Sequence, residues 1–425
     1  IPCGLILFNV PGYFSPALVQ VPVFRDWPVQ IFPHVPVINL LIYFPVIGFM
    51  YLVPTAISFS IWFFHLFYLV EWGFVQQAGI LNLRGDPYVY SWTPLSWQSW
   101  GAFVAMVGWS LWMARDHLLA VWRTAWGREG WIDDRDEMVS YRVAVCGGLA
   151  GLAFILWWLW RSGLELHLAA LYMAGAMTIF LGITRLVVQA GMYYLTTPMS
   201  AQGMVTAMLG SGLGPQNLVA LALTFAWCSD VQSTFMPSAA NALKLHDYYT
   251  HRRQGGLALA IGLAVVVSFA ATSCFMIYLC YDYGAANLRS WFFNASGGAG
   301  GRAFDWATQQ MRDPAPTDWD KLGIFGSGAL AYLALTFLHY RLPWWPLHPV
   351  GLAVASTWMV KRIAFSVFVA WLCKRLVLRF GGVALYQRLK PFFVGLAVGF
   401  FVGVFLSFGV DVVWFKGGGH PILHG

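Results

Sequence analysis

Long apolar runs recur along the chain and are separated by short polar segments. A membrane-spanning helix needs about 20 mainly apolar residues, and such runs follow one another from about residue 38 to residue 413. We expect regular spans at 55–74, 97–114, 142–160, 166–195, 255–281, 322–339, 363–379 and 391–413. The pattern predicts an all-α fold, a polytopic bundle of transmembrane helices, in one domain of about 10–12 helical segments over residues 36–413.

Three further apolar segments are too interrupted to span as regular helices. Residues 38–53 contain Pro45 and Gly48, residues 199–230 contain four glycine and proline residues between 210 and 215, and residues 341–360 contain three prolines. Such residues leave backbone groups unpaired, which lipid tolerates only where protein or water satisfies them. We therefore expect broken or re-entrant helices inside the bundle.

The stretch "RLPWWPLHPVGLAVASTW", residues 341–358, allows two interpretations. In the first, a helix over 350–360 lies at the membrane interface, anchored by Trp344 and Trp345. In the second, a half-helix enters the protein, and the N–H groups of its first turn point inward with partial positive charge. The second interpretation places His348 at a binding site; the alternative is that His348 caps the half-helix or meets lipid headgroups.

An internal comparison favours the half-helix. "PVIGFMYLVPTAISFSIWFFHL" begins at Pro45 and "PVGLAVASTWMVKRIAFSVFVAWL" at Pro349, and both run from Pro-Val through a glycine to an I-x-F-S sequence. Paired broken segments in two halves indicate the substrate site of a transporter with inverted repeats. Common structural origin and chance recurrence both stay open. The residues predicted to bind substrate are Pro45, Gly48, Ser60, Trp344, Trp345, His348, Gly351 and Ser366.

Three motifs carry a family resemblance: "IYFPVIGFMYLVPTAISFSIWFF", "RLPWWPLHPVGLAVA" and "GGVALYQRLKPFFVGLAVGFFVG". With them the chain resembles an uncharacterised prokaryotic family of multi-pass membrane proteins, which is itself similar to a distant branch of the oligopeptide-transporter superfamily. The resemblance covers most of the chain, and its motifs are positional rather than catalytic. It implies a large helical transporter of two inverted repeats, with substrate held between broken helices and protons as a candidate driving force. It assigns no substrate-binding residue.

The segments outside the spans have their own patterns. Residues 1–35 are rich in proline and aromatic residues, and we expect an irregular segment at the interface. Residues 115–141 combine helical apolar spacing with many charges, which predicts an amphipathic cytoplasmic helix and loop. Residues 283–321 predict a polar outer loop with a short amphipathic helix, and residues 414–425 a polar tail. Because the chain opens without Met, we expect N-terminal helices of the family pattern to be missing.

Composition narrows the class of protein. Hydrophobic residues make up 59% of the 425 residues and charged residues 10%, against about a quarter charged in soluble domains. The net charge of +7 arises mostly from Lys and Arg in short loops, where they orient helices in the membrane, so we expect no nucleic-acid partner. These features predict an integral membrane protein, and the family resemblance implies a prokaryotic inner (cytoplasmic) membrane.

Ionisable residues inside spans are costly and indicate function. Ion coupling or gating is therefore predicted for Arg185, Gln189, His65 and Glu71. The alternatives are a structural partner for Arg185, either a carbonyl or a carboxylate, and a hydrogen-bonded core role for His65. The candidate carboxylates for Arg185 are Glu71, Asp230 and Asp411.

Other polar clusters give weaker evidence of function. Residues 230–247 are interpreted as an ordinary polar loop, with a cytoplasmic vestibule as the alternative; the polar residues concerned are Asp230, Asn241, Lys244, His246 and Asp247. His420 and His424 lack a third ligand, so we expect no metal. The six cysteines form no CxxC, and no HExxH, Walker or G-x-S-x-G motif occurs. We expect no enzyme and no cofactor.

Two functions remain from the sequence. The first is a secondary active transporter that moves a small organic or peptide-like solute by alternating access, with the solute between the broken segments. The alternative is a non-transporting structural or accessory subunit of a larger redox or photosynthetic membrane complex. The expected partners are the lipid bilayer, a small-molecule solute, and further copies or subunits of a membrane complex.

Overall fold

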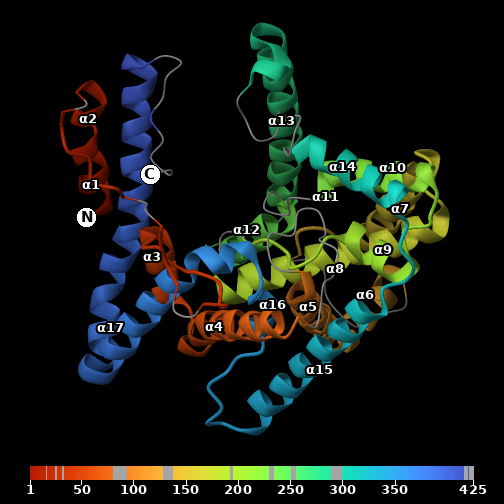
Figure 1. Ribbon diagram of the computed structural model, residues 1–425, viewed down its shortest axis with the longest axis horizontal. Coiled ribbons are helices and arrows are strands. Elements are labelled where there is room, and N and C mark those ends of the chain that lie inside the picture. The colour runs from red at the N-terminus through yellow and green to blue at the C-terminus, as the bar shows by residue number, and fades with distance from the viewer. Residues whose placement is uncertain are drawn as a thin grey trace.

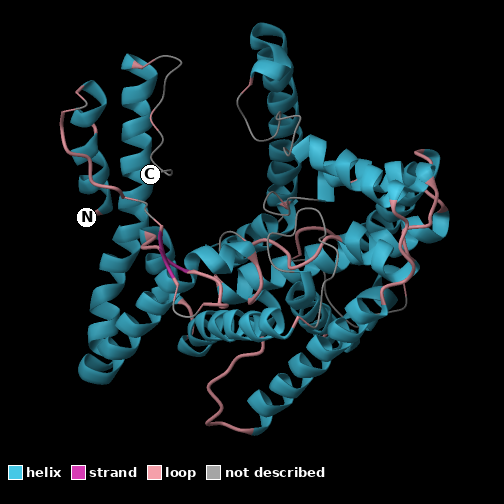
Figure 2. Ribbon diagram, in the orientation of Figure 1, coloured by secondary structure: helices cyan, strands magenta, loops and turns pink. Residues whose placement is uncertain are grey.

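The computed structural model describes residues 1–15, 17–23, 26–30, 33–79, 93–127, 137–191, 195–228, 234–249, 255–288, 299–415 and 420. Over these residues the fold is helical apart from one antiparallel ribbon of β1 (Trp27–Val29) and β2 (Ile38–Leu40) (Figure 2). Six described helices are long and apolar enough to cross a membrane: α4 (Thr55–Ala78), α7 (Tyr141–Arg161), α8 (Leu166–Ala190), α13 (Gly255–Leu279), α15 (Trp319–Arg341) and α17 (Trp358–Trp414). The predicted all-α class is confirmed, and these helices indicate an integral membrane protein.

Helix α5 (Thr93–Met113) packs closely along α15. A Cβ atom on Gly101 would meet the Phe325 carbonyl, and one on Gly328 would meet the Gln98 carbonyl. Small residues on both helices therefore bring the two backbones into contact, as is common between membrane helices. Trp97 and Trp100 fill the space beside this crossing and are fully buried.

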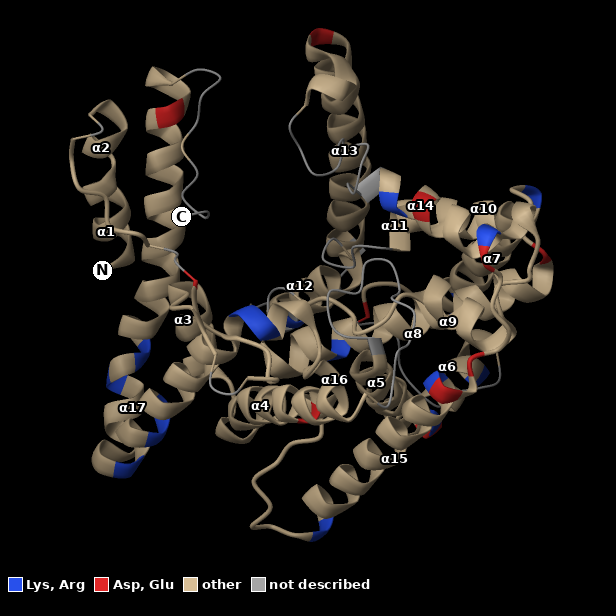
Figure 3. Ribbon diagram, in the orientation of Figure 1, with Lys and Arg blue, Asp and Glu red and all other residues tan. Residues whose placement is uncertain are grey.

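Helix α17 is two arms joined by a bend at Gly382, whose φ of 62° suits glycine (Figure 1). The arms contain the predicted spans 363–379 and 391–413. Lys and Arg residues gather near the bend (Figure 3), and no acidic residue occurs from the start of α17 to Asp411. Helix α3 (Phe44–Leu52) packs against α17, with Tyr51 stacked on Phe393 at 3.7 Å between ring centroids.

The first 35 residues differ from the predicted irregular segment. They contain α1 (Pro2–Asn9) and α2 (Pro11–Phe14), each opened by a proline in its first turn, where its missing N–H costs nothing. Helix α1 buries Ile6 against the second arm of α17, where Gly403 lets the backbones approach. Short helices give too few turns for apolar periodicity to be recognised, which explains the difference.

The interruption predicted within residues 199–230 is present. Helices α9 (Ala201–Leu209), α10 (Pro215–Leu223) and α11 (Phe225–Cys228) are separated by loops, with positive φ at Gly210 and Gly214. Ser211 N–H donates to the Ala315 carbonyl at 2.8 Å, and Ala315 N–H donates to Ser211 Oγ at 2.7 Å. Protein rather than water therefore satisfies the backbone at this break.

The remaining described helices are α6 (Arg115–Ala125), α12 (Phe235–Tyr249), α14 (Ala299–Arg312) and the short α16 (Val350–Val354). A π-helical turn, Cys280–Gly284, and a 3-10 turn, Ala285–Asn287, follow α13. Helix α12 corrects the interpretation of residues 230–247 as a loop, because its Ala and Leu residues favour a helix around Asn241, Lys244 and His246. Asp230 and the side chain of Asp247 lie outside the described residues.

Candidate functional site

The two short helices from the sequence comparison lie crosswise in the fold. Helix α3, from the first copy, packs against α17, the long helix of the second copy. Helix α16, from the second copy, packs against α4, the long helix of the first copy, and against α5. Figure 1 shows α3 beside α17 and α16 beside α4. Each short helix is therefore held by the long helix that follows the other one.

Both ends of α16 are bonded by side chains of α4. Ser60 Oγ accepts a hydrogen bond of 2.6 Å from the N–H of His348, just before the helix. At the other end, His65 Nδ1 lies 3.1 Å from the carbonyl of Ala355, the C-cap residue. Because a carbonyl only accepts, Nδ1 of His65 carries the proton. A Cβ atom on Gly351 would overlap the Ser60 carbonyl, so glycine is what lets α16 lie this close.

The ends of α3 are bonded in the same way by α17. Ser366 Oγ accepts a hydrogen bond of 2.9 Å from the N–H of Tyr43, the N-cap residue of α3. Lys374 Nζ donates to the carbonyl of Val53, the C-cap residue, at 2.7 Å. The serine of each I-x-F-S sequence thus binds the start of the opposite short helix, and an imidazole or ammonium group binds its end.

This geometry changes the interpretation of several predicted site residues. The polar atoms of Ser60, Ser366 and His65 bond the backbone of the half-helices, so these residues position the half-helices. A backbone end that lies away from water needs such partners. Lys374 was missed, although a lysine inside a predicted span is itself a functional signal.

The predicted glycine and proline residues of the short helices also serve packing. Pro45 lies in the first turn of α3, where it opens the helix and does not break it, and it is buried. A Cβ atom on Gly48 would meet the Phe393 carbonyl of α17. The predicted helix over 350–360 is also corrected, because α16 ends at Val354 and α17 begins at Trp358.

A polar chain leads from α8 to the start of α16. Arg185 Nε donates to Gln189 Oε1 at 3.2 Å, and Gln189 Nε2 lies 3.4 Å from His348 Nε2. The ring of His339, at the end of α15, lies 5.0 Å from the ring of His348. The structure therefore brings together Arg185 and Gln189, predicted for coupling, with His348, predicted for substrate.

His348 is neutral at physiological pH. It lies in the loop between α15 and α16, outside the six spanning helices. Burial, as the largest cause, together with the neighbouring His339 and Arg185 side chains, lowers its pKa to about 4. A neutral imidazole accepts at one nitrogen, and His348 Nδ1 accepts from the N–H of Val350 at 3.2 Å. Its Nε2 then carries the proton, so the 3.4 Å approach of Gln189 Nε2 is a polar contact and not a hydrogen bond.

The partner that the described residues give Arg185 is a carbonyl and not a carboxylate. Arg185 Nη1 donates to the carbonyl of Met106 on α5 at 2.8 Å, and Tyr332 lies beside it. Of the predicted partners, Asp411 binds His420 at 2.8 Å, Glu71 interacts with Gln98, and Asp230 lies outside the described residues. Within the described part of the chain, no carboxylate forms an ion pair with Arg185. Its positive charge is therefore uncompensated there.

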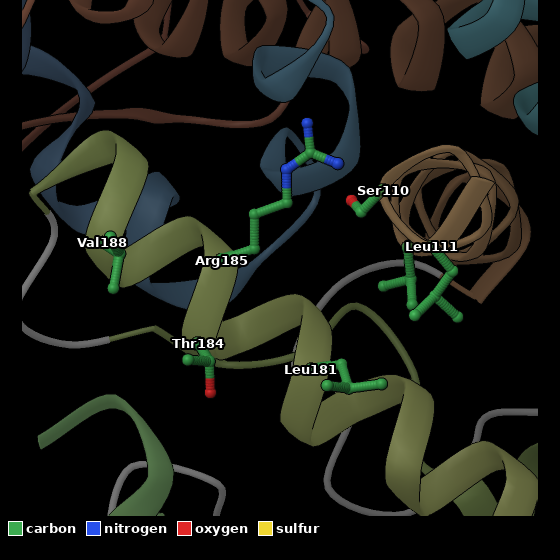
Figure 4. A pocket seen from close by; sticks show the side chains of 7 residues that line it. Ser110, Leu111, Leu181, Thr184, Arg185 and Val188 are labelled. Atoms are coloured by element: carbon green, nitrogen blue, oxygen red, sulfur yellow. The ribbon is translucent and has the colours of Figure 1, made fainter. Parts of the chain in front are cut away.

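A pocket of about 310 Å³ lies between α5 and α8 beside this arginine. Figure 4 shows the guanidinium of Arg185 reaching towards Ser110 of α5, whereas Leu111, Leu181 and Val188 lie lower in the view. The walls are mostly aliphatic, and the guanidinium is the one charged group among the lining residues. Such a pocket suits a small molecule with one anionic group and an apolar remainder.

The two predicted tryptophans lie further out. Trp344 is 72% exposed, and its ring centroid lies 5.8 Å from that of Trp345, which is half-buried. His420 binds Asp411, and His424 lies outside the described residues. Among the described side chains, no group of three or more His, Cys, Asp and Glu residues is placed to hold a metal.

Comparison with known proteins shows the family of the chain. The model of a family of unknown function, DUF6785, matches residues 1–422, so the chain belongs to that family. No curated protein and no solved structure matches the chain.

Proposed function

We propose that this member of the DUF6785 family is a secondary active transporter, which moves a small organic or peptide-like solute across a prokaryotic cytoplasmic membrane by alternating access. The crossed binding of α3 and α16 carries the proposal. Transporters with inverted repeats hold paired broken helices in their two halves, and the resemblance to a distant branch of the oligopeptide-transporter superfamily agrees with this arrangement.

The contacts suggest which parts move together. Helix α16 is bonded at both ends to α4, so the two form one unit. One link from this unit to α8 is the contact of 3.4 Å between Gln189 Nε2 and His348 Nε2. We propose that rocking of the α4–α16 unit against α8 opens and closes this contact, and that the solute binds beside it.

A reversible crosslink tests the proposal. In a chain without its native cysteines, Gln189→Cys and His348→Cys would be joined by a short bis-methanethiosulfonate reagent and released by dithiothreitol. Uptake into proteoliposomes would be measured for labelled hexanoate, alanyl-alanine, alanyl-alanine amide and hexylamine. We expect the crosslink to stop uptake of the transported member at least tenfold and reduction to restore it. Each single-cysteine variant treated with the reagent is the control.

Two outcomes contradict the proposal. One is uptake that proceeds unchanged through the crosslinked chain. The other is absence of uptake for every probe with folded protein in the vesicles, which favours the accessory-subunit alternative. One observation supports that alternative: none of the apolar stretch of α13 is buried and only 6% of that of α7, which leaves large apolar surfaces for lipid or partner subunits.

A further inference from the structure

The surface of the pocket between α5 and α8 is almost wholly apolar, and the side chain of Arg185 forms part of its wall. Of its lining residues, Val107, Leu111, Leu181 and Val188 are aliphatic, and Arg185 supplies the charge. A charge held among apolar groups is costly unless it is paired and hydrogen-bonded. The Met106 carbonyl, Gln189 and the Tyr332 hydroxyl hydrogen-bond Arg185, and none of these described partners carries an opposite charge.

The hydrogen bonds around Arg185 restrict the ligand further. Ser110 Oγ donates its hydrogen to the Met106 carbonyl, and Thr184 Oγ1 donates to the Phe180 carbonyl. Neither hydroxyl has a hydrogen left for a ligand, so Arg185 is the donor side chain among the lining residues. Nε and one hydrogen of Nη1 are already engaged, and the Tyr332 hydroxyl also hydrogen-bonds the guanidinium, which leaves up to two of its five N–H groups.

We infer that this pocket binds the carboxylate of a small organic monocarboxylate, with Arg185 holding the carboxylate and the aliphatic walls holding a short apolar tail. One guanidinium balances one negative charge, which favours a carboxylate over a doubly charged phosphate. Lack of further donors disfavours sugars and other polyhydroxyl compounds. A volume of about 310 Å³ is at the low end for small-molecule sites, which fits a small ligand. That the bound anion is the transported solute rests on the proposed function; its binding does not.

Direct binding tests the inference without transport. The purified full chain in detergent would be dialysed to equilibrium against labelled hexanoate, with protein-free micelles as the blank. We expect saturable binding that unlabelled hexanoate displaces. The same concentrations of 1-hexanol and hexylamine, which match the tail without the carboxylate, should not displace it.

Matched variants locate the site. Arg185→Gln should weaken hexanoate binding at least tenfold, whereas Arg379→Gln, which removes an exposed arginine of α17, should leave it within twofold. Val188→Trp should weaken binding by filling the pocket, because Val188 lines it and is 55% exposed. Val143→Trp changes a valine of α7 that is 60% exposed and serves as the control. If Arg185→Gln does not fold, the comparison of Val188→Trp with Val143→Trp still tests whether hexanoate binds in this pocket.

The inference fails if 1-hexanol displaces hexanoate as well as hexanoate itself, or if Arg185→Gln and Val188→Trp both bind like the unaltered chain. It also fails if phosphatidylglycerol displaces hexanoate at lower concentration in a manner that needs Arg185, since the occupant is then a lipid headgroup. Uptake of alanyl-alanine amide without hexanoate binding would overturn this inference alone. Hexanoate binding without uptake of any probe would overturn the transporter alone.

Discussion

The two half-helices are bound alike but lead to different surroundings. Both α3 and α16 have a serine of the opposite long helix at their start and a basic side chain at their end. The start of α16 continues into His348, Gln189 and Arg185, whereas the start of α3 is held by Ser366, which also donates to the Leu41 carbonyl. The bonds that hold the ends of the two half-helices, which we call the scaffold, are therefore common to both halves. The polar residues of the candidate site lie only at the start of α16.

The largest expected effect is on the scaffold. Gly48→Ala and Gly351→Ala each place a Cβ atom against a backbone carbonyl of a neighbouring helix, and we expect each to lower the free energy of unfolding by about 3 kcal/mol. Gly395→Ala is the control, because its Cβ atom meets nothing within 4 Å, and it should gain up to about 1 kcal/mol from helix propensity. Titration with dodecyl sulfate in mixed micelles measures the free energy of unfolding of each variant. Equal stability of all three variants would contradict the close packing at Gly48 and Gly351.

The sequence was informative about where the chain breaks and less so about what each break contacts. Short helices could be predicted from Pro45, Gly48 and Pro349, because proline and glycine act on the backbone next to them and need no knowledge of the fold. The I-x-F-S comparison predicted a relation between the halves, but residues about 300 apart cannot be paired by periodicity. Arg185 needed a partner, and only the fold could decide between carbonyl and carboxylate. The Met106 carbonyl carries no side-chain signal at all.

The next effect compares the ends of the two half-helices. Lys374→Met removes a charged donor from the Val53 carbonyl, and Lys374 is 6% exposed, so we expect a loss of about 2 kcal/mol. His65→Phe removes the donor to the Ala355 carbonyl, and we expect a loss of about 1 kcal/mol, the typical contribution of one hydrogen bond. The same unfolding titration measures both. A larger loss for His65→Phe than for Lys374→Met would contradict this order.

A smaller effect on stability separates scaffold from site. Ser60→Ala and Ser366→Ala each leave one N–H near a helix start without its acceptor, and we expect each to lose about 1 kcal/mol. Hexanoate binding should weaken only in Ser60→Ala, because Ser60 holds His348 in place. Ser58→Ala is the control, since the Ser58 hydroxyl bonds only carbonyls of its own turn. Equal weakening of binding in Ser60→Ala and Ser366→Ala would remove the functional difference between the halves.

The smallest effect concerns the tryptophan pair before α16. Trp344 is 72% exposed, so Trp344→Ala should change the free energy of unfolding by less than about 0.5 kcal/mol. Its exposure fits an anchor at the membrane interface, and an anchor does not touch the solute, so hexanoate binding should stay within twofold. A tenfold loss of binding in Trp344→Ala would place the tryptophan in the solute path. The site would then extend from Arg185 across His348 to the surface, and the interface interpretation of Trp344 would be wrong.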